Sequence, residues 1–181
     1  GVIKPGDVQW MTAGKGIVHD EFHSEEFSKK GGVFEMVQLW INLPRKHKMT
    51  DPKYQEIASK NIPIISLGNS LKLRVIAGEF EENSGPSTTF TKVNLYDITS
   101  KEEQNISLSF EHGTNTIILI MRGELKIENK NFKNKDILIF DREGTQIDLK
   151  VSHHFKGLIL NGEPIDEPVV AHGPFVMNTK N

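Results

Sequence analysis

Short segments with strand character recur through the second half of the chain, and their spacing constrains the fold more than any other feature. They come about every eight to twelve residues, alternate or run apolar, and are separated by turn residues. The segments are 62–67, 71–78, 91–98, 105–110, 115–122, 124–128, 135–140, 146–151 and 157–160. This pattern is typical of an all-β barrel or sandwich, and we predict that fold class.

The first part of the chain carries strand signals and one helix signal. Lys4–Lys15 reads as a strand, a tight turn and a strand, and Phe34–Leu43 reads as a strand that ends at Pro44. Asp51 at a cap position, followed by Pro52 as a first helical residue, predicts a short helix.

Chain length divides these elements into unequal domains. A β-sandwich or small barrel needs about a hundred residues. Residues 62–181 provide 120 residues, whereas the residues before them are too few for a second barrel. We therefore expect an incomplete first barrel in 1–50, a linker helix in 51–61 and a complete second barrel in 62–181. Open edges of an incomplete barrel favour pairing, so we expect a homodimer through them.

Composition excludes several classes of protein. Hydrophobic residues make up 36% of the chain and charged residues 25%, which is ordinary globular usage. A net charge of −2 argues against direct nucleic-acid binding, and no apolar run approaches the length of a membrane span. The absence of cysteine rules out disulfides and thiolate metal sites, and a reducing cytoplasm is the expected location.

One cluster of polar residues indicates a metal site. In an extended segment His19, Glu21 and His23 project from the same face, because side chains alternate with period two. Imidazole and carboxylate groups suit a borderline divalent metal such as Fe(II), Zn or Ni. A fully extended strand separates residues 19 and 23 by roughly 13 Å, so one ion reaches both only at a bulge or bend. The alternative is a solvated polar strand face.

Three separated motifs resemble the pirin family, in the family's order. They are Gly1–Glu21, Gln38–Gln55 and Asn161–Thr179. Pirins are bicupins, with two tandem cupin-type β-barrels, and the N-terminal barrel holds a metal on three His and one Glu. The resemblance therefore implies a tandem barrel fold and matches His19 and Glu21 to the last two of those ligands.

The sequence departs from the family pattern at the other two ligands. The resemblance places them in a His-x-His motif upstream of the Pro5-Gly6-Asp7 turn, but no His precedes His19. We expect the first barrel to lack its N-terminal part. The intact site would take Fe(II) or another divalent ion (Zn, Ni, Cu or Mn), and this chain by itself is expected to bind metal incompletely or not at all.

The resemblance leaves two classes of function open. The first is a quercetin 2,3-dioxygenase-type oxidoreductase, with an Fe-type centre and a small aromatic, flavonol-like substrate. Glu21 would then be both a metal ligand and the catalytic base, and Trp10 and Phe34 would line the cavity. The second is a non-catalytic, metal-dependent regulatory module that binds a protein partner. A truncated, inactive pirin without metal is a variant of the second class.

Overall fold

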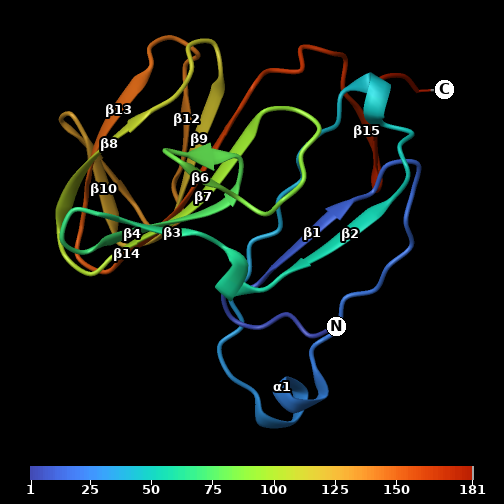
Figure 1. Cartoon of the computed structure of the whole chain (residues 1–181), viewed down its shortest axis with the longest axis horizontal. Coiled ribbons are helices and arrows are strands. Elements are labelled where there is room, and N and C mark those ends of the chain that lie inside the picture. Colours follow the sequence, from blue (N-terminus) through green and yellow to red (C-terminus); the bar gives the residue numbers. More distant parts are fainter. Residues whose placement is uncertain (181) are drawn as a thin grey trace. The chain divides into compact units, whose positions relative to one another are not determined.

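The computed structural model describes residues 1–180, which are almost entirely strands and loops (Figure 1). The chain divides into two compact units. Unit 1 comprises Gly1–Glu56 and the C-terminal segment from Ile165, and unit 2 comprises Ile57–Pro164. The all-β prediction is confirmed.

Unit 2 is built from two large antiparallel sheets and one small hairpin. The six-stranded sheet has the order β12-β9-β14-β7-β4-β3. Its strands are β3 (Ile64–Leu67), β4 (Leu71–Ala77), β7 (Val93–Ser100), β9 (Asn115–Arg122), β12 (Ile137–Phe140) and β14 (Phe155–Gly162). The four-stranded sheet has the order β11-β10-β13-β8. Its strands are β8 (Gln104–Ser109), β10 (Glu124–Ile127), β11 (Lys130–Lys133) and β13 (Gln146–Val151). The hairpin pairs β5 (Glu79–Phe80) with β6 (Asn83–Ser84).

The hydrophobic core of unit 2 lies between the two large sheets. Alternate residues of each strand point inward, as the period-two pattern of the sequence predicts. Both sheets contribute fully buried side chains: Leu71, Leu73, Val75, Ile98, Ile118, Ile120 and Ile159 from the larger sheet, and Leu108, Leu125 and Val151 from the smaller one. The sheets therefore form a barrel-like sandwich closed by apolar contact.

Gly123 connects the two sheets at the bend between β9 and β10. Its φ of +80° is a left-handed conformation, and a Cβ there would lie 2.7 Å from Ser152 Oγ and 3.2 Å from Phe155 Cα. Only glycine meets both conditions without displacing its neighbours. This turn allows the chain to cross from the larger sheet to the smaller one.

Unit 1 contains short elements joined by long irregular segments. Its two-stranded sheet pairs β1 (Val8–Thr12) with β2 (Lys53–Ile57), and a second pair joins β15 (Val170–His172) to β16 (Phe175–Met177). One helix, α1, spans Glu25–Lys30, and short 3-10 turns occupy Arg45–His47 (η1) and, at the start of unit 2, Ser59–Asn61 (η2).

The helix expected over 51–61 is corrected by the structure. Residues Lys53–Ile57 form β2 instead, and only the 3-10 turn Ser59–Asn61 follows. Pro52 stands just before the strand, a position that proline tolerates as well as the first turn of a helix. Hydrogen bonding to β1 therefore overrides the local cap signal, because a short segment takes the conformation that its tertiary partner requires.

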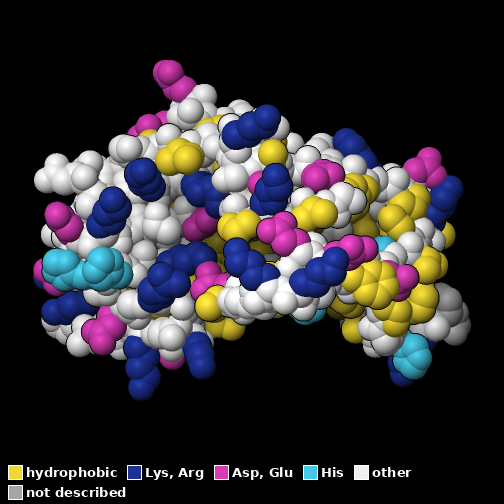
Figure 2. All heavy atoms as spheres, turned by 90° about the horizontal axis from the view of Figure 1, so that it is seen from below, with side chains coloured by type: hydrophobic (Ala, Val, Ile, Leu, Met, Phe, Trp, Pro, Cys, Tyr) yellow, Lys and Arg dark blue, Asp and Glu magenta, His cyan; other side chains and the backbone are white. Residues whose placement is uncertain are grey.

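The strand expected over Phe34–Leu43 is also corrected. These residues form no strand, and Phe34, Met36 and Trp40 are exposed by 61%, 53% and 66%. Figure 2 shows one face of the molecule, on which such apolar side chains (yellow) lie open between charged ones. A strand is stable only beside a hydrogen-bonded neighbour, and within residues 1–180 none pairs with this segment. The apolar alternation is present, but no strand among the described residues pairs with it.

The C-terminal segment from Ile165 groups with Gly1–Glu56 in unit 1. The expected second cupin domain over 62–181 stays a prediction. Lys48 is buried, and its Nζ donates to Asn42 Oδ1 at 2.6 Å and to the Val176 carbonyl at 2.8 Å. Glu167 accepts from the Arg45 amide at 2.6 Å and from Asn178 Nδ2 at 3.1 Å. These side chains tie β16 and its approach to the loop around η1. Burial lowers the pKa of Lys48, and the carboxylate of Glu167 opposes that shift.

No helix within residues 1–180 has both the length and the apolar character needed to cross a membrane.

We predict that Lys48→Met lowers the free energy of unfolding of unit 1 by about 1–3 kcal/mol, because it leaves two acceptors without their donor. Hydrogen exchange of the β15 and β16 amides measures this change directly. Lys46→Met, an exposed lysine in the same turn, is the matched control and should exchange like the wild type. If the β16 amides exchanged equally slowly in Lys48→Met and in the wild type, the hydrogen bonds of Lys48 would not be what holds the C-terminal strand pair in place.

Tyr96 provides a second test, in the core of unit 2. Its ring is 2% exposed and its hydroxyl donates to the Glu79 carbonyl. Burial, with a smaller contribution from the charge of Glu79, raises the pKa of Tyr96 to about 12 from an ordinary value of 10.0. The folded protein therefore favours the protonated Tyr96 hydroxyl more strongly than the unfolded chain does. The stability gained from this preference is complete below pH 10 and is lost as the pH rises toward 12.

We therefore expect the unfolding free energy of the wild type to fall more steeply between pH 10 and pH 12 than that of Tyr96→Phe. At neutral pH the variant should be less stable by about 1 kcal/mol, since it lacks the hydroxyl's hydrogen bond. Urea titrations at several pH values check both statements, with Tyr54→Phe, at an exposed tyrosine, as the control. If the unfolding free energies of the wild type and Tyr96→Phe changed with pH in the same way, the loss of stability above pH 10 could not come from Tyr96.

Candidate metal centre

A glycine turn fixes the direction in which the chain leaves β1 toward His19. The Lys15 amide donates to the Thr50 carbonyl at 2.9 Å, and Lys15 Nζ lies 2.5 Å from Asp51 Oδ1. Gly14 has a φ of +52°, and a Cβ at this position would lie 2.1 Å from the Thr50 carbonyl oxygen. The turn therefore requires glycine at residue 14, because any side chain would collide with the backbone of the neighbouring segment.

His19 and Glu21 lie beyond this turn, in a segment without regular secondary structure. His19 Nδ1 is 4.0 Å from Glu21 Oε1, and the two side chains are 38% and 45% exposed. The two side chains thus come together as the alternation predicts, although residues 17–24 form no strand. The pair stays accessible to an ion or a small molecule from solvent.

The separation of the two donor atoms is compatible with a shared metal ion. Protein nitrogen and oxygen ligands bind borderline metals at about 2.0–2.2 Å, so two ligands of one ion lie less than roughly 4.2 Å apart. The observed 4.0 Å falls inside this limit. Within residues 1–180, however, no three His, Cys, Asp or Glu side chains gather closely enough to hold an ion. The pair therefore fits as part of a ligand set and falls short of a complete site.

His23 does not join the pair and belongs to an aromatic cluster. Its ring stacks on Phe27 at a centroid distance of 5.3 Å and meets the edge of Phe34 at 4.9 Å. Helix α1 presents Phe27 to His23, because Ser24 caps the helix by accepting from the Phe27 amide at 3.2 Å. His23 thus stabilises the loop that follows the pair. Phe34 contacts both His23 and Phe27, so it belongs to this cluster as well.

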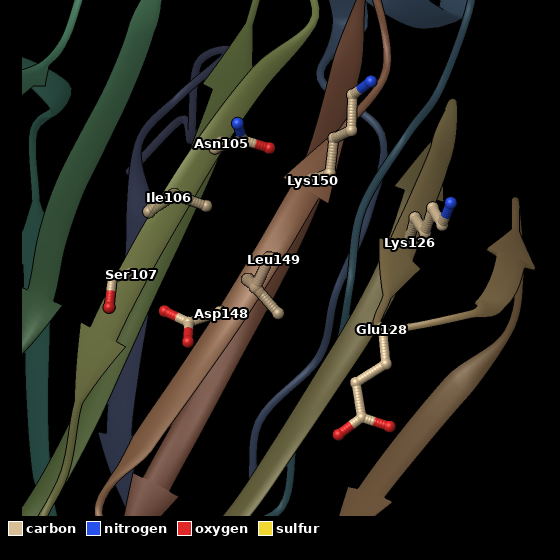
Figure 3. A pocket seen from close by; sticks show the side chains of 8 residues that line it. All are labelled: Asn105, Ile106, Ser107, Lys126, Glu128, Asp148, Leu149 and Lys150. Carbon is tan, nitrogen blue, oxygen red and sulfur yellow. The ribbon is translucent and has the colours of Figure 1, made fainter.

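Two surface hollows of unit 2 provide other candidate sites. The first, about 570 Å³ in volume, lies over the four-stranded sheet (Figure 3). Lys126 and Lys150 lie at one end of it, and Asp148 and Glu128 lie toward the other. Hydrogen bonds from Gln146 and Ser107 lower the pKa of Asp148. This hollow is open, and its two lysines lie apart from its two carboxylates, so it has no concentrated ligand set.

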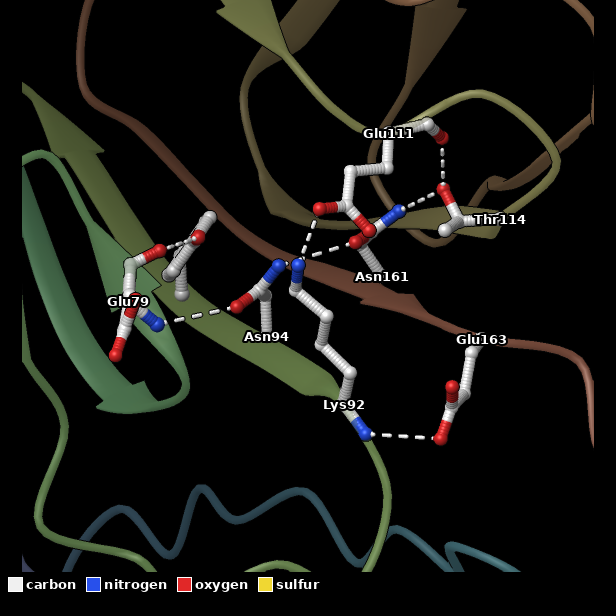
Figure 4. Close-up of polar contacts among 8 residues, drawn as sticks. Glu79, Lys92, Asn94, Glu111, Thr114, Asn161 and Glu163 are labelled. Atoms are coloured by element: carbon white, nitrogen blue, oxygen red, sulfur yellow. Dashed lines mark hydrogen bonds and ion pairs between the residues drawn. The ribbon is translucent and has the colours of Figure 1, made fainter.

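The second hollow, about 350 Å³ in volume, is lined in part by Phe110 and Phe140 and by several carboxylates, among them Glu111 and Asp141. Behind its threonines stands a hydrogen-bonded network that joins three strands of the larger sheet (Figure 4). Asn161 Nδ2 donates to Thr114 Oγ1 at 2.8 Å and to Thr116 Oγ1 at 3.0 Å, and Asn161 Oδ1 accepts from Asn94 Nδ2 at 3.1 Å. The network satisfies a buried amide, which is a structural role. Neither hollow is lined by His19 or Glu21.

Comparison with family models and with known proteins identifies the family. The Pirin model matches residues 1–41, and the model of the pirin C-terminal cupin domain matches residues 95–181. The chain is 32% identical over 196 residues to a Thermoplasma acidophilum protein named "Putative quercetin 2,3-dioxygenase", covering 100% of this chain and 75% of that protein. The chain belongs to the pirin family.

Two further relatives extend this result. A Pseudomonas aeruginosa pirin relative, also named "Putative quercetin 2,3-dioxygenase", is 39% identical over 181 residues, which are 99% of this chain and 63% of that protein. A crystal structure of quercetin 2,3-dioxygenase from Acinetobacter baumannii matches with a TM-score of 0.95 and 46% identity, over 98% of this chain and 62% of that one. This chain thus spans under two thirds of the length of both proteins. The match confirms the cupin-type architecture.

Some residues that shape the site region have no signature in the sequence. The contact of His23 with Phe27 spans the start of helix α1, since His23 precedes the Ser24 cap and Phe27 lies in the first turn. The contact of either residue with Phe34 depends on how the loop returns, which no local pattern specifies. The hydrogen bonds from Lys48 to Val176 and from Arg45 to Glu167 join residues more than a hundred positions apart.

We predict that His23→Ala loosens the loop over residues 23–34, because an aromatic pair contributes about 1 kcal/mol beyond its buried area. Trypsin cleavage after Lys29 or Lys30 should then be roughly fivefold faster, if cleavage follows local opening. His23→Phe preserves the ring contacts and should cleave like the wild type. Cleavage of His23→Ala at the wild-type rate would contradict the role of the cluster.

Proposed function

We propose that this pirin is a metal-dependent dioxygenase of the quercetin 2,3-dioxygenase type, with His19 and Glu21 as two of its metal ligands. The observation that carries the proposal is the approach of His19 Nδ1 and Glu21 Oε1 to 4.0 Å on an accessible segment. The names of the matched relatives support a flavonol-like substrate. Fe(II) is the metal that we propose, and Zn, Ni, Cu and Mn accept the same donor atoms.

The remaining ligands would come from outside residues 1–180. Metal sites with an open catalytic position use at least three protein ligands, and the described residues bring two together. The family resemblance points to a His-x-His motif as the source of the others. The proposal is thus that this chain carries one half of the site.

Glu21 is the residue that we propose as catalytic. When bound, the metal supplies the dioxygen chemistry. A carboxylate that uses one oxygen as a ligand keeps a second oxygen, which can accept the hydroxyl proton of a flavonol. His19 would hold the ion in place beside that carboxylate. Because both side chains are partly exposed, a substrate could approach them without a change in the fold.

Elemental analysis tests the metal assignment. A protein that includes the proposed His-x-His segment should contain about one metal ion per chain, and His19→Ala and Glu21→Gln should each lose most of it, since losing one ligand weakens a site strongly. His112→Ala changes an exposed histidine of unit 2 and is the matched control. Full metal content in the His19→Ala protein would overturn the assignment. The 181-residue chain alone should bind metal more weakly than the longer form.

Dioxygen uptake with quercetin tests the activity separately. The rate of dioxygen uptake should fall with metal content in His19→Ala and Glu21→Gln, and it should stay at the wild-type level in His112→Ala. A metal-loaded protein that consumes no dioxygen with quercetin would leave the metal site standing and rule out the proposed substrate.

The alternative is a non-catalytic module that binds another protein through its surface. The specific observation in its favour is the large set of exposed apolar side chains in unit 1, including Phe22 at 87%, Val33 at 92% and Trp40 at 66%. Exposed apolar patches mark interaction sites. A folded protein that includes the His-x-His segment, yet has neither metal nor dioxygen uptake, would favour this function over the dioxygenase.

A further inference from the structure

The second hollow of unit 2 combines apolar and acidic side chains. Its apolar lining consists of four half-buried residues that also pack against the core: Phe110, Ile127, Phe140 and Ile147. Five exposed carboxylates line it as well, those of Glu111, Glu128, Asp141, Glu143 and Asp148. Among residues 1–180, no lysine, arginine or histidine does so. Ligand sites in proteins are concave and largely apolar, with volumes from about 300 Å³ upward. At about 350 Å³, this hollow is large enough for a small organic ligand.

One aromatic ring of the hollow is held in place by the core behind it. Phe110 stacks on Tyr96 at a centroid distance of 6.5 Å, and Phe80 meets the edge of Tyr96 at 5.5 Å. Tyr96 is itself only 2% exposed. The Phe110 ring is therefore positioned without any ligand. The face of such a ring attracts a cation, which adds to the apolar contact that the ring provides.

Three of the five carboxylates are available to a ligand. Lys92 pairs with Glu111 (Figure 4), and Gln146 Nε2 donates to Asp148 Oδ1 at 3.0 Å. The other three form no ion pair within residues 1–180, and they are Glu128, Asp141 and Glu143. The exposed side of the hollow thus keeps negative charge that the described residues do not neutralise.

The arrangement of this charge favours an organic cation over a metal ion. Nowhere in the described part of the chain do three His, Cys, Asp or Glu side chains converge on one point. Arg142 lies between Asp141 and Glu143 in the sequence, but it does not line the hollow, and its Nε donates to Asn115 Oδ1 at 2.8 Å. One guanidinium group offsets only part of the charge of three carboxylates. Dispersed negative charge beside aromatic rings suits an ammonium group on an apolar body.

A buried hydroxyl group of the hollow has an unused hydrogen. Thr116 lines the hollow, is 5% exposed, and shares the inward-facing row of β9 with Ile118. Its Oγ1 accepts from Asn161 Nδ2 at 3.0 Å, but no acceptor within residues 1–180 receives its hydrogen. The neighbouring Thr114 hydroxyl, by contrast, donates to the Glu111 carbonyl at 2.6 Å. Buried donors are rarely left without an acceptor. Thr116 can therefore donate to an acceptor atom of a ligand.

We infer that this hollow binds a small aromatic amine that carries a hydrogen-bond acceptor on its ring. The ammonium group lies among the exposed carboxylates, the ring packs against Phe110 and Phe140, and the ring's oxygen accepts from the Thr116 hydroxyl. The site binds its ligand without a chemical step. Neither His19 nor Glu21 lines it, so the inference does not depend on the proposed metal centre.

Isothermal titration calorimetry with tyramine at neutral pH tests this site. Tyramine has a charged ammonium group and a phenolic oxygen at opposite ends of its ring. Phenethylamine lacks the phenolic oxygen, and its Kd should be roughly fivefold higher, because one hydrogen bond is lost. Tyrosol replaces the ammonium group by a neutral hydroxyl, and its Kd should be roughly tenfold higher.

The variant Thr116→Val tests the buried end of the site. Valine preserves the shape of the side chain, and Asn161 Nδ2 keeps the Thr114 hydroxyl and the Asn115 carbonyl as acceptors. Tyramine and phenethylamine should therefore bind this variant with equal affinity. If tyramine kept its advantage over phenethylamine in Thr116→Val, the hydroxyl would not be the donor to the ligand.

A charge variant tests the exposed side of the site. Asp141→Asn combined with Glu143→Gln should raise the Kd of both amines by roughly fivefold and leave that of tyrosol unchanged. Glu82→Gln changes an exposed carboxylate of unit 2 outside the hollow and is the matched control. Circular dichroism establishes that each variant is folded.

Three results would overturn the inference as a whole. The first is the absence of tyramine binding at millimolar concentration, and the second is tyrosol binding as tightly as tyramine. The third is a protein that includes the proposed His-x-His segment and no longer binds tyramine. That result would mean that another part of the longer protein fills the hollow.

Discussion

The contact between the two sheets of unit 2 is the interaction on which the rest of the structure depends. Each sheet is apolar on the face that it turns toward the other, and fully buried side chains such as Leu73, Ile118 and Val151 fill the space between them. Neither sheet could bury that face alone, because a single sheet leaves one side in water. The sharp bend at Gly123 and the hydrogen bonds of Asn161 then hold particular strands in register within this frame.

Unit 1 depends on polar ties more than on an apolar core. Few of its residues are buried, and one of those few is Lys48, which connects the loop before β2 to the C-terminal strand pair. The segment that carries His19 and Glu21 is positioned by the Gly14 turn at one end and by the aromatic cluster of His23 at the other. The two proposed ligands thus lie on a loop that is fixed at both ends, where a metal or a substrate can reach them. Cupin-type architecture by itself does not fix the chemistry, so the proposed activity rests on this pair.

Much of unit 2 could be predicted from the sequence, because its strands satisfy their local pattern and their tertiary pairing at once. The segments expected at 71–78, 115–122 and 146–151 correspond closely to β4, β9 and β13. The two expectations that failed, a helix at 51–61 and a strand at 34–43, lie in unit 1, where a local signal and the available partner disagree. For the candidate site, the period-two pattern predicted that His19, Glu21 and His23 share one face. His19 and Glu21 do lie close together. The His23 ring instead packs against Phe27 and Phe34 in a separate cluster.

The sequence by itself determined the fold class, the family and the pairing of an imidazole with a carboxylate at residues 19 and 21. These properties depend on local alternation and on motifs, which are written in consecutive residues. Only the tertiary structure decided that residues 53–57 are a strand, that the C-terminal segment packs with unit 1, and that β12 leaves two isoleucines exposed at a sheet edge. Each of these outcomes depends on which distant segment supplies hydrogen bonds or apolar contact, and a sequence pattern specifies the need for such a partner without specifying its position.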